Sequence, residues 1–468
     1  MLTQIALIIL LNLIVFFRTL SYGMVIDDNC RTFHKNDIAK NWLKRLFQNS
    51  RYSGYGGLPL PVDHLFTTLL HTAVCVVVYK AFGSNQVSFA TALLFSVHPV
   101  NNQVSIWLNG KRFAVVALLT LLMWATRPLG LVFYLLSPVW HFGGFPAILL
   151  GVHTPWVWVL WLLPIIAIVF HKKIINKIGS RWERIPHGEI KRIHPKKFII
   201  LFKMFGYTFW HCLFPRRMSF YHMFMERFGF CDEDNKYWYS LNKDFWVGLV
   251  TLIGVICCTA LNWNTPLGFG LYWYVIFISM WLQFPLGFTQ AISERVYYLP
   301  NIGLMYALSY ALRDYPYVLV AVFVYYLTKL YNYMPAYKNI NEFYRYALNE
   351  FPDQFRARAH VVQRNLQENR IFFCLRDCGI GLKLNPSDNT LNLLMCQSLM
   401  SLGAWGKAEE YLNTARKTII PGQEKTIART IDSFQVIINK MKSDPNTVLK
   451  QIKPDREVII KPEQIVKE

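Results

Sequence analysis

The sequence predicts an all-α protein, a polytopic bundle of membrane-spanning helices followed by a small α-helical repeat unit. Of its 468 residues, 53% are hydrophobic and 16% are charged, whereas soluble domains average about 25% charged residues. The apolar residues gather in blocks long enough to cross a bilayer, which takes about 17–25 residues. Polar residues dominate the C-terminal part. We therefore expect a transmembrane domain at 1–335, a repeat domain at 336–442 and an extended or disordered tail at 443–468.

The apolar blocks predict about eleven membrane spans. The first block, Leu2–Leu20, has no basic region before it and no small-residue cleavage site after it. We interpret it as a retained membrane helix rather than a cleaved signal. The stretch 113–141 fits either one long span or two. The spans are expected at 2–20, 62–82, 84–98, 113–126, 128–141, 145–170, 198–214, 245–262, 267–288, 300–312 and 315–334.

Charge and cysteine content narrow the class of protein. The net charge is +21, which fits basic loops beside anionic lipid headgroups, because no basic run is interleaved with a nucleic-acid-binding motif. The nine cysteines show no spacing typical of a metal site or a disulfide framework. A loop from His171 to Lys197 holds nine Lys or Arg and two Glu, which is typical of the cytoplasmic side. Alternation of the spans then places the repeat domain on the periplasmic or lumenal side.

The C-terminal part contains a period of 34 residues. Three pairs of residues have this separation: Pro352 and Pro386, Cys374 and Ala408, and Gly381 and Ala415. Small residues at fixed positions and a proline at the repeat end are typical of tetratricopeptide repeats, which pair helices in units of this length. We expect about two repeats, preceded by a helix at Ile340–Glu350 and followed by a capping helix near 424–441.

Four polar clusters lie in loops that alternation assigns to one face of the membrane. A carboxylate there can accept the proton of an acceptor hydroxyl, and cations can hold a leaving phosphate. The candidate catalytic residues are Asp27 and Asp28. The candidate phosphate-binding and donor-binding residues are His98, Lys111, Arg112, Arg216, Arg217, Glu294 and Arg295.

Each cluster also has an ordinary structural interpretation. The acidic pair could be solvated or could cap a helix, and His98 before Pro99 could simply end one. Lys111 could anchor a helix end at the membrane interface. Glu294 could form a structural ion pair with the arginine beside it. A metal ion, Mg²⁺ or Mn²⁺, is compatible with paired carboxylates and phosphate, and the residues leave its presence open.

The clusters occur in the order found in a known family. They read V-I-D-D at 25–28, H-P-V-N-N-Q-V-S-I-W-L-N-G-K at 98–111, F-P-R-R-M-S at 214–219 and E-R-V-Y-Y-L-P at 294–300. With the repeats, the chain resembles the transmembrane and tetratricopeptide-repeat O-mannosyltransferases and their bacterial relatives, within the GT-C class of membrane glycosyltransferases. The resemblance covers nearly the whole chain.

This resemblance implies the GT-C fold and a polyprenyl- or dolichyl-phosphate sugar donor. It also implies an inverting transfer to a protein or glycan hydroxyl at a bacterial inner membrane or the endoplasmic reticulum. One of Asp27 and Asp28 becomes the base, and Arg295 a phosphate ligand. The chain departs from the family pattern at three places. Gln103 replaces a glutamate, Lys111 replaces an arginine, and a Lys-Glu pair is missing where Trp140-His141-Phe142 stands.

Two other classes of function stay open on the sequence. In the first, the chain is a catalytically idle membrane scaffold that recruits partners through its repeats, which Gln103 and the missing Lys-Glu pair favour. In the second, it is a transporter of lipid-linked sugars. Charges at the bilayer midplane would indicate a transporter, whereas the charges here gather near one membrane face.

Overall fold

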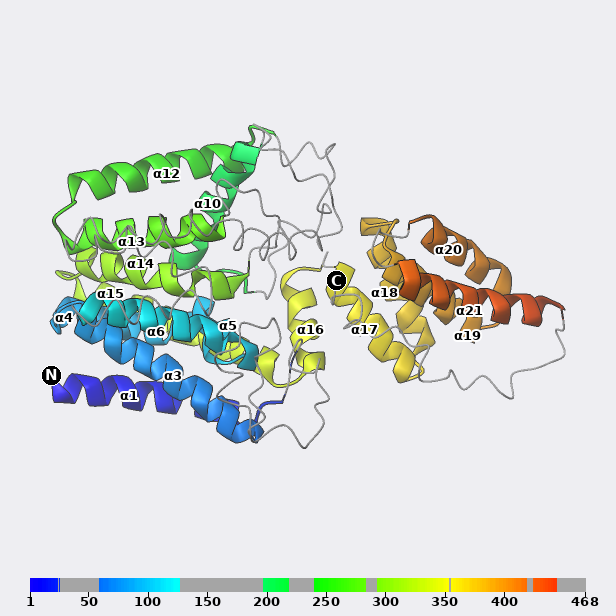
Figure 1. Cartoon of the computed structure of the whole chain (residues 1–468), viewed down its shortest axis with the longest axis horizontal. Helices are drawn as coiled ribbons and strands as arrows, with labels where there is room; N and C mark the ends of the chain where they lie inside the picture. The colour runs from blue at the N-terminus through cyan, green and yellow to red at the C-terminus, as the bar shows by residue number, and fades with distance from the viewer. Residues whose placement is uncertain are drawn as a thin grey trace, which may run out of the picture. The chain divides into compact units, whose positions relative to one another are not determined.

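The computed structural model is all-helical over the residues that it describes (Figure 1). These residues are 1–23, 25, 59–126, 197–218, 240–282, 293–352, 355–418 and 424–443. The described residues form two compact units, one ending at Phe343 and the other beginning at Tyr344. The first unit contains the predicted membrane spans, and the second contains the predicted repeats.

Nine of the predicted spans lie wholly or partly within the described residues, and each of these nine contains a helix there. The long helices of the first unit are α1 (Leu2–Phe16), α3 (Leu60–Ala81), α4 (Gln86–Ser96), α6 (Lys111–Ala125), α10 (Lys197–Leu213), α12 (Lys243–Leu261), α13 (Pro266–Trp281), α14 (Tyr298–Ala311) and α15 (Pro316–Tyr333). Short helical turns connect them: η1 (Phe17–Ser21), η4 (Pro99–Asn101), α5 (Asn102–Ser105), η5 (Leu108–Gly110), η8 (Glu294–Tyr297) and η9 (Met334–Tyr337).

Three of the described helical segments are long and apolar enough to cross a membrane. They are Leu2–Ser21, Leu60–Ala81 and Lys243–Leu261. This supports a membrane protein, while the total of about eleven spans and their sidedness stay predictions. The spans expected at 128–141 and 145–170 lie outside the described residues.

The distribution of polar and apolar side chains also fits a lipid environment. Leu10 on α1 and Val250 on α12 have exposed fractions of 53% and 66%. Asn12 and His71 are fully buried instead, and the Asn12 amide donates a hydrogen bond of 3.0 Å to the Ser96 hydroxyl. Apolar residues outside and paired polar residues inside are the arrangement that hydrocarbon favours.

Glycines allow the helices to pack closely. Figure 1 shows α13 and α14 side by side, and their backbones meet at Gly270 and Gly303. A Cβ atom on Gly303 would lie 2.5 Å from the Gly270 carbonyl oxygen. Helices α10 and α12 meet in the same way, since a Cβ atom on Gly206 would lie 2.6 Å from the Gly248 Cα. Small residues at such crossings are typical of membrane helices.

The second unit is a series of helices, and those from its second helix onward pack in chain order. They are α16 (Ile340–Glu350), whose first residues belong to the first unit, α17 (Phe355–Gln367), α18 (Ile371–Leu384), α19 (Asn389–Ser401), α20 (Trp405–Lys417) and α21 (Glu424–Ser443). The starts of α17 and α19 are separated by the period expected from the sequence, and so are the starts of α18 and α20. The predicted period therefore appears as a repeat of helix pairs.

The small residues that define the period lie where these helices pack. Cys374, Ala408 and Ala415 are fully buried. A Cβ atom on Gly381 would lie 2.6 Å from Leu391 Cδ1, so only glycine fits without movement of that side chain. Cys374 is thus a packing residue.

The glycine crossing of α13 and α14 gives a test of the membrane unit. We expect Gly303→Leu to lower the free energy of unfolding by about 1–3 kcal/mol, because the added side chain overpacks a closed interface. Thermal unfolding in detergent measures the effect. Gly254→Leu is the control, since nothing lies within 4 Å of a Cβ atom there. Equal melting temperatures for the two variants would contradict this packing.

Candidate functional site

Two of the four predicted clusters come together at one end of the first unit. The loop between α4 and α6 contains His98 to Gly110, and its turns η4 and α5 contact η8, which begins at Glu294. Segments far apart in the sequence therefore become neighbours.

Glu294 is the buried acid of this site. Its side chain is fully buried, and the Asn102 amide nitrogen donates a hydrogen bond of 2.5 Å to one carboxylate oxygen. His211 Nε2 lies 3.7 Å from the other oxygen. The Asn102 amide nitrogen also donates to the Pro99 carbonyl oxygen at 2.6 Å. This arrangement stabilises the carboxylate where burial alone would cost free energy.

A tyrosine from the turn after α15 fixes the orientation of that asparagine. The Tyr337 hydroxyl donates a hydrogen bond to Asn102 Oδ1, which leaves the amide nitrogen directed at Glu294. Burial raises the pKa of the Tyr337 hydroxyl well above its usual value, so the group stays protonated and donates. The chain Tyr337 to Asn102 to Glu294 thus joins three segments far apart in the sequence.

Arg295 lies beside Gln103. Its backbone N–H is 3.3 Å from Gln103 Oε1, and its guanidinium is 3.5 Å from the same oxygen. The guanidinium also lies 5.6 Å from the Trp107 ring centroid. An amide oxygen accepts the hydrogen bonds that a carboxylate would accept, but it brings no negative charge.

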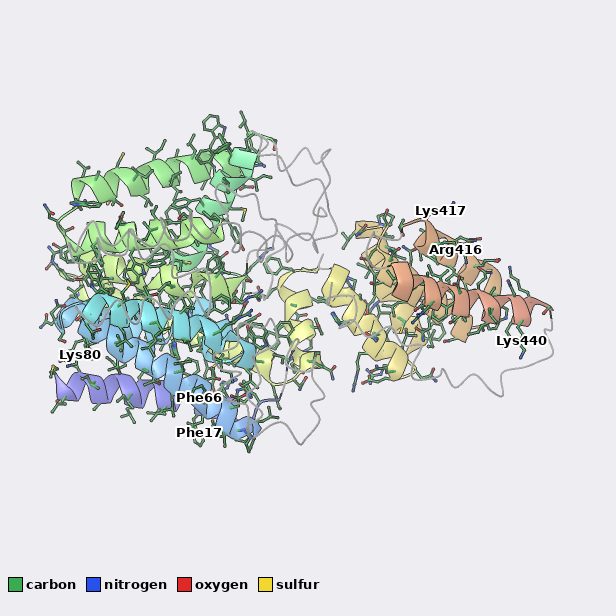
Figure 2. The ribbon with its side chains drawn as sticks, in the orientation of Figure 1. Phe17, Phe66, Lys80, Arg416, Lys417 and Lys440 are labelled. Carbon is green, nitrogen blue, oxygen red and sulfur yellow. The ribbon has the colours of Figure 1, made fainter. Side chains whose placement is uncertain are left out.

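Lys111 has a partner that the sequence did not indicate. Its ammonium group forms an ion pair with Asp63, and both side chains are buried. It also lies 5.9 Å from the centroid of the Phe66 ring, labelled in Figure 2. Gly110, the preceding residue, packs so closely that a Cβ atom would lie 1.7 Å from the Gln103 carbonyl oxygen. The Gly-Lys pair therefore fastens the loop to α3.

His98 also holds the loop in place. The ring is fully buried, and its Nε2 donates a hydrogen bond of 2.8 Å to the Cys212 carbonyl oxygen. Its Nδ1 accepts the Val100 N–H at 3.3 Å. Because main-chain groups engage both nitrogens, the neutral ring has one tautomer, with the proton on Nε2. A role for His98 in donor binding stays a prediction.

The remaining predicted donor-binding residues are Arg112, Arg216 and Arg217. Arg216 and Arg217 follow α10 and are exposed, and the Lys329 ammonium donates to the Arg216 carbonyl oxygen at 3.2 Å. Arg112 stands in the first turn of α6, where its guanidinium lies 5.3 Å from the Phe113 ring centroid.

Asp27 and Asp28 lie outside the described residues. The structure describes two residues shortly before them. The Gly23 N–H donates a hydrogen bond of 2.9 Å to the Lys338 carbonyl oxygen, and Val25 is buried. Lys338 directly follows the tyrosine that orients Asn102. The segment leading to the predicted acidic pair is therefore anchored to the same turn as the Glu294 network.

Among the described residues, no group of three or more His, Cys, Asp or Glu has an arrangement that could hold a metal ion. The sequence left open whether Asp27 and Asp28 hold Mg²⁺ or Mn²⁺, and both residues lie outside the described ones.

Three residues of the site were not predicted from the sequence: Asp63, His211 and Tyr337. Asp63 falls inside an expected apolar span, where a carboxylate is a signal in its own right. His211 sits near the end of α10, and Tyr337 is one of many tyrosines. Neither belongs to a motif.

Comparison of the chain with protein-family models, with curated proteins and with solved structures finds no match.

A double-mutant cycle tests whether Lys111 and Asp63 stabilise the protein as a pair. We expect Lys111→Met or Asp63→Leu alone to lower the free energy of unfolding by about 3–5 kcal/mol, because each leaves a buried charge without its partner. The double variant is expected to recover most of that loss. Unfolding in detergent measures all three.

Lys80→Met is the matched control, since Lys80 at the other end of α3 is exposed and donates to the Met1 sulfur. Its effect is expected to stay within about 0.5 kcal/mol. A double variant as unstable as the sum of the two single variants would show that the pair does not interact.

Proposed function

We propose that the chain is a membrane glycosyltransferase that moves a sugar from a polyprenyl- or dolichyl-phosphate donor to a hydroxyl of a protein or glycan. The observation that carries the proposal is the meeting of Glu294 and Arg295 with the loop at His98–Lys111, at one end of an apolar helical unit. A site of this kind offers a cation for phosphate close to the region where a lipid carrier travels.

In the proposed reaction, a carboxylate of Asp27 or Asp28 takes the proton from the acceptor hydroxyl. The acceptor oxygen forms a bond to the anomeric carbon as the bond from that carbon to the phosphate oxygen breaks, with inversion. The lipid phosphate leaves with the bonding electrons, and Arg295 stabilises its charge. No covalent intermediate is required.

The neighbours of Arg295 suit this role. Gln103 accepts hydrogen bonds from Arg295 and, as a neutral amide, adds no negative charge beside it. Glu294 is turned toward Asn102 and His211, where it holds η8 in place. Lys111 and His98 position the loop. The exposed Arg216 and Arg217 supply further positive charge for the donor headgroup.

The second unit is proposed to be a tetratricopeptide-repeat domain that presents the acceptor. Its helix pairs recur with the period of the sequence, and small residues are buried at matching positions. In repeats of this kind the concave face commonly binds peptide. The first unit is proposed to have the GT-C fold with about eleven spans, on the resemblance of its motifs.

A second candidate is a membrane scaffold without catalytic activity. It is favoured by the finding that His98, Lys111 and Glu294 are each buried and engaged by protein groups. Under this alternative, the network only stabilises the unit, and the repeats recruit a partner.

Sugar transfer by the purified protein in lipid tests the proposal. Radiolabelled polyprenyl-phosphate sugars serve as donors and a cell extract as acceptor. We expect Asp27→Asn combined with Asp28→Asn to reduce turnover by about 10²–10⁴-fold with donor binding intact, because only the base is removed. Arg295→Ala is expected to weaken donor binding as well, because it removes a phosphate contact.

Arg313→Ala is the matched control, since Arg313 lies just beyond the opposite end of α14 and pairs with Asp314. It should behave as wild type. Transfer that is unchanged in the Asp and Arg295 variants would overturn the site assignment. No transfer from any donor, with the protein folded, would favour the scaffold.

A further inference from the structure

The outer face of α18 in the second unit is unusual for a water-exposed helix. Phe372 and Phe373 have exposed fractions of 79% and 50%, and Ile380 is 38% exposed. Arg376 and Lys383 are also exposed. At 3.6 residues per turn these five positions fall on one stripe of the helix, opposite the buried cysteines of α18. The stripe, here called the α18 face, carries aromatic, aliphatic and basic side chains.

The repeat itself supplies a comparison. Helix α20 occupies the equivalent place one period later, and its positions that match the α18 face are likewise exposed. These positions hold Gly406, Lys407, Glu410, Thr414 and Lys417, the last labelled in Figure 2. The packing of the repeat therefore does not require apolar residues at these places. Because α18 has apolar residues at these places and α20 does not, the α18 face is expected to contact something outside the repeat.

The charge on the α18 face is an excess of cations. The Arg376 guanidinium lies 5.1 Å from the Phe373 ring centroid and 3.3 Å from an oxygen of Asp377. The buried Asp377 carboxylate is already paired with Arg358 at 3.2 Å. Two arginines thus share one carboxylate, and none of the five side chains on the face is acidic.

We propose that the α18 face rests on the surface of the lipid bilayer. Exposed phenylalanines beside cations match the interface between acyl chains and anionic headgroups. The last predicted membrane span, at 315–334, is close along the chain, because only η9, α16 and α17 stand between the end of α15 and the start of α18. The cations on the same face as the exposed aromatic rings favour an anionic lipid headgroup as the occupant. This surface is independent of the proposed glycosyl transfer.

Photocrosslinking in the full-length chain tests the proposal. A benzoylphenylalanine is placed at Phe372 in one protein and at the equivalent Gly406 in another. Gly406 tolerates it, because nothing lies within 4 Å of a Cβ atom there. Both proteins are reconstituted in phosphatidylcholine vesicles with about one-fifth phosphatidylserine, irradiated and digested.

Mass spectrometry of the digest should find lipid adducts at position 372 in about tenfold excess over position 406, because only the α18 face enters the interface. Equal yields at both positions, or no lipid adduct at 372, would overturn the proposal. A peptide adduct at 372 in place of lipid would overturn it too, and its sequence would identify a protein partner or a second copy.

Discussion

A polar group buried among apolar helices is costly without a partner, and the pairs formed under this constraint hold the segments of the first unit together. An unpaired polar group in such surroundings costs several kcal/mol. The hydrogen bonds from Tyr337 to Asn102 and from Asn102 to Glu294 provide such partners, and so does the ion pair of Lys111 and Asp63. Because their partners lie on other segments, satisfying these groups also fixes how the segments meet.

The loop between α4 and α6 is the clearest result of that constraint. It is fastened to α10 by His98, to α3 by Lys111 and to η8 by Asn102. Gly110 allows the loop to fold back on Gln103. A loop held at so many points is preorganised, which is what a binding or catalytic site on a connecting segment requires. The same contacts would equally stabilise an idle scaffold.

Gln103 stands where the family that we propose for the chain has a glutamate, and this difference has a defined physical consequence. Its amide oxygen keeps the hydrogen bonds to Arg295, so the geometry of the turn is compatible with the change. What changes is the local charge, which becomes more positive by one unit. The extra positive charge would strengthen phosphate binding by Arg295. A reaction that needs a second carboxylate base would lose that base. The substitution therefore bears on the chemistry rather than on the fold.

The sequence by itself determined the helices and the period of the repeats. Long apolar runs are local signals, and so is the regular spacing of small residues such as Cys374 and Ala408. It also located the segments around His98 and Glu294. Only the tertiary structure decided which side chains pair: Asp63 with Lys111, Tyr337 with Asn102, and His211 beside Glu294. These contacts join residues from different helices and turns, far apart along the chain. Periodicity reports how a residue faces its own helix, and it contains no information on which distant segment will supply the partner.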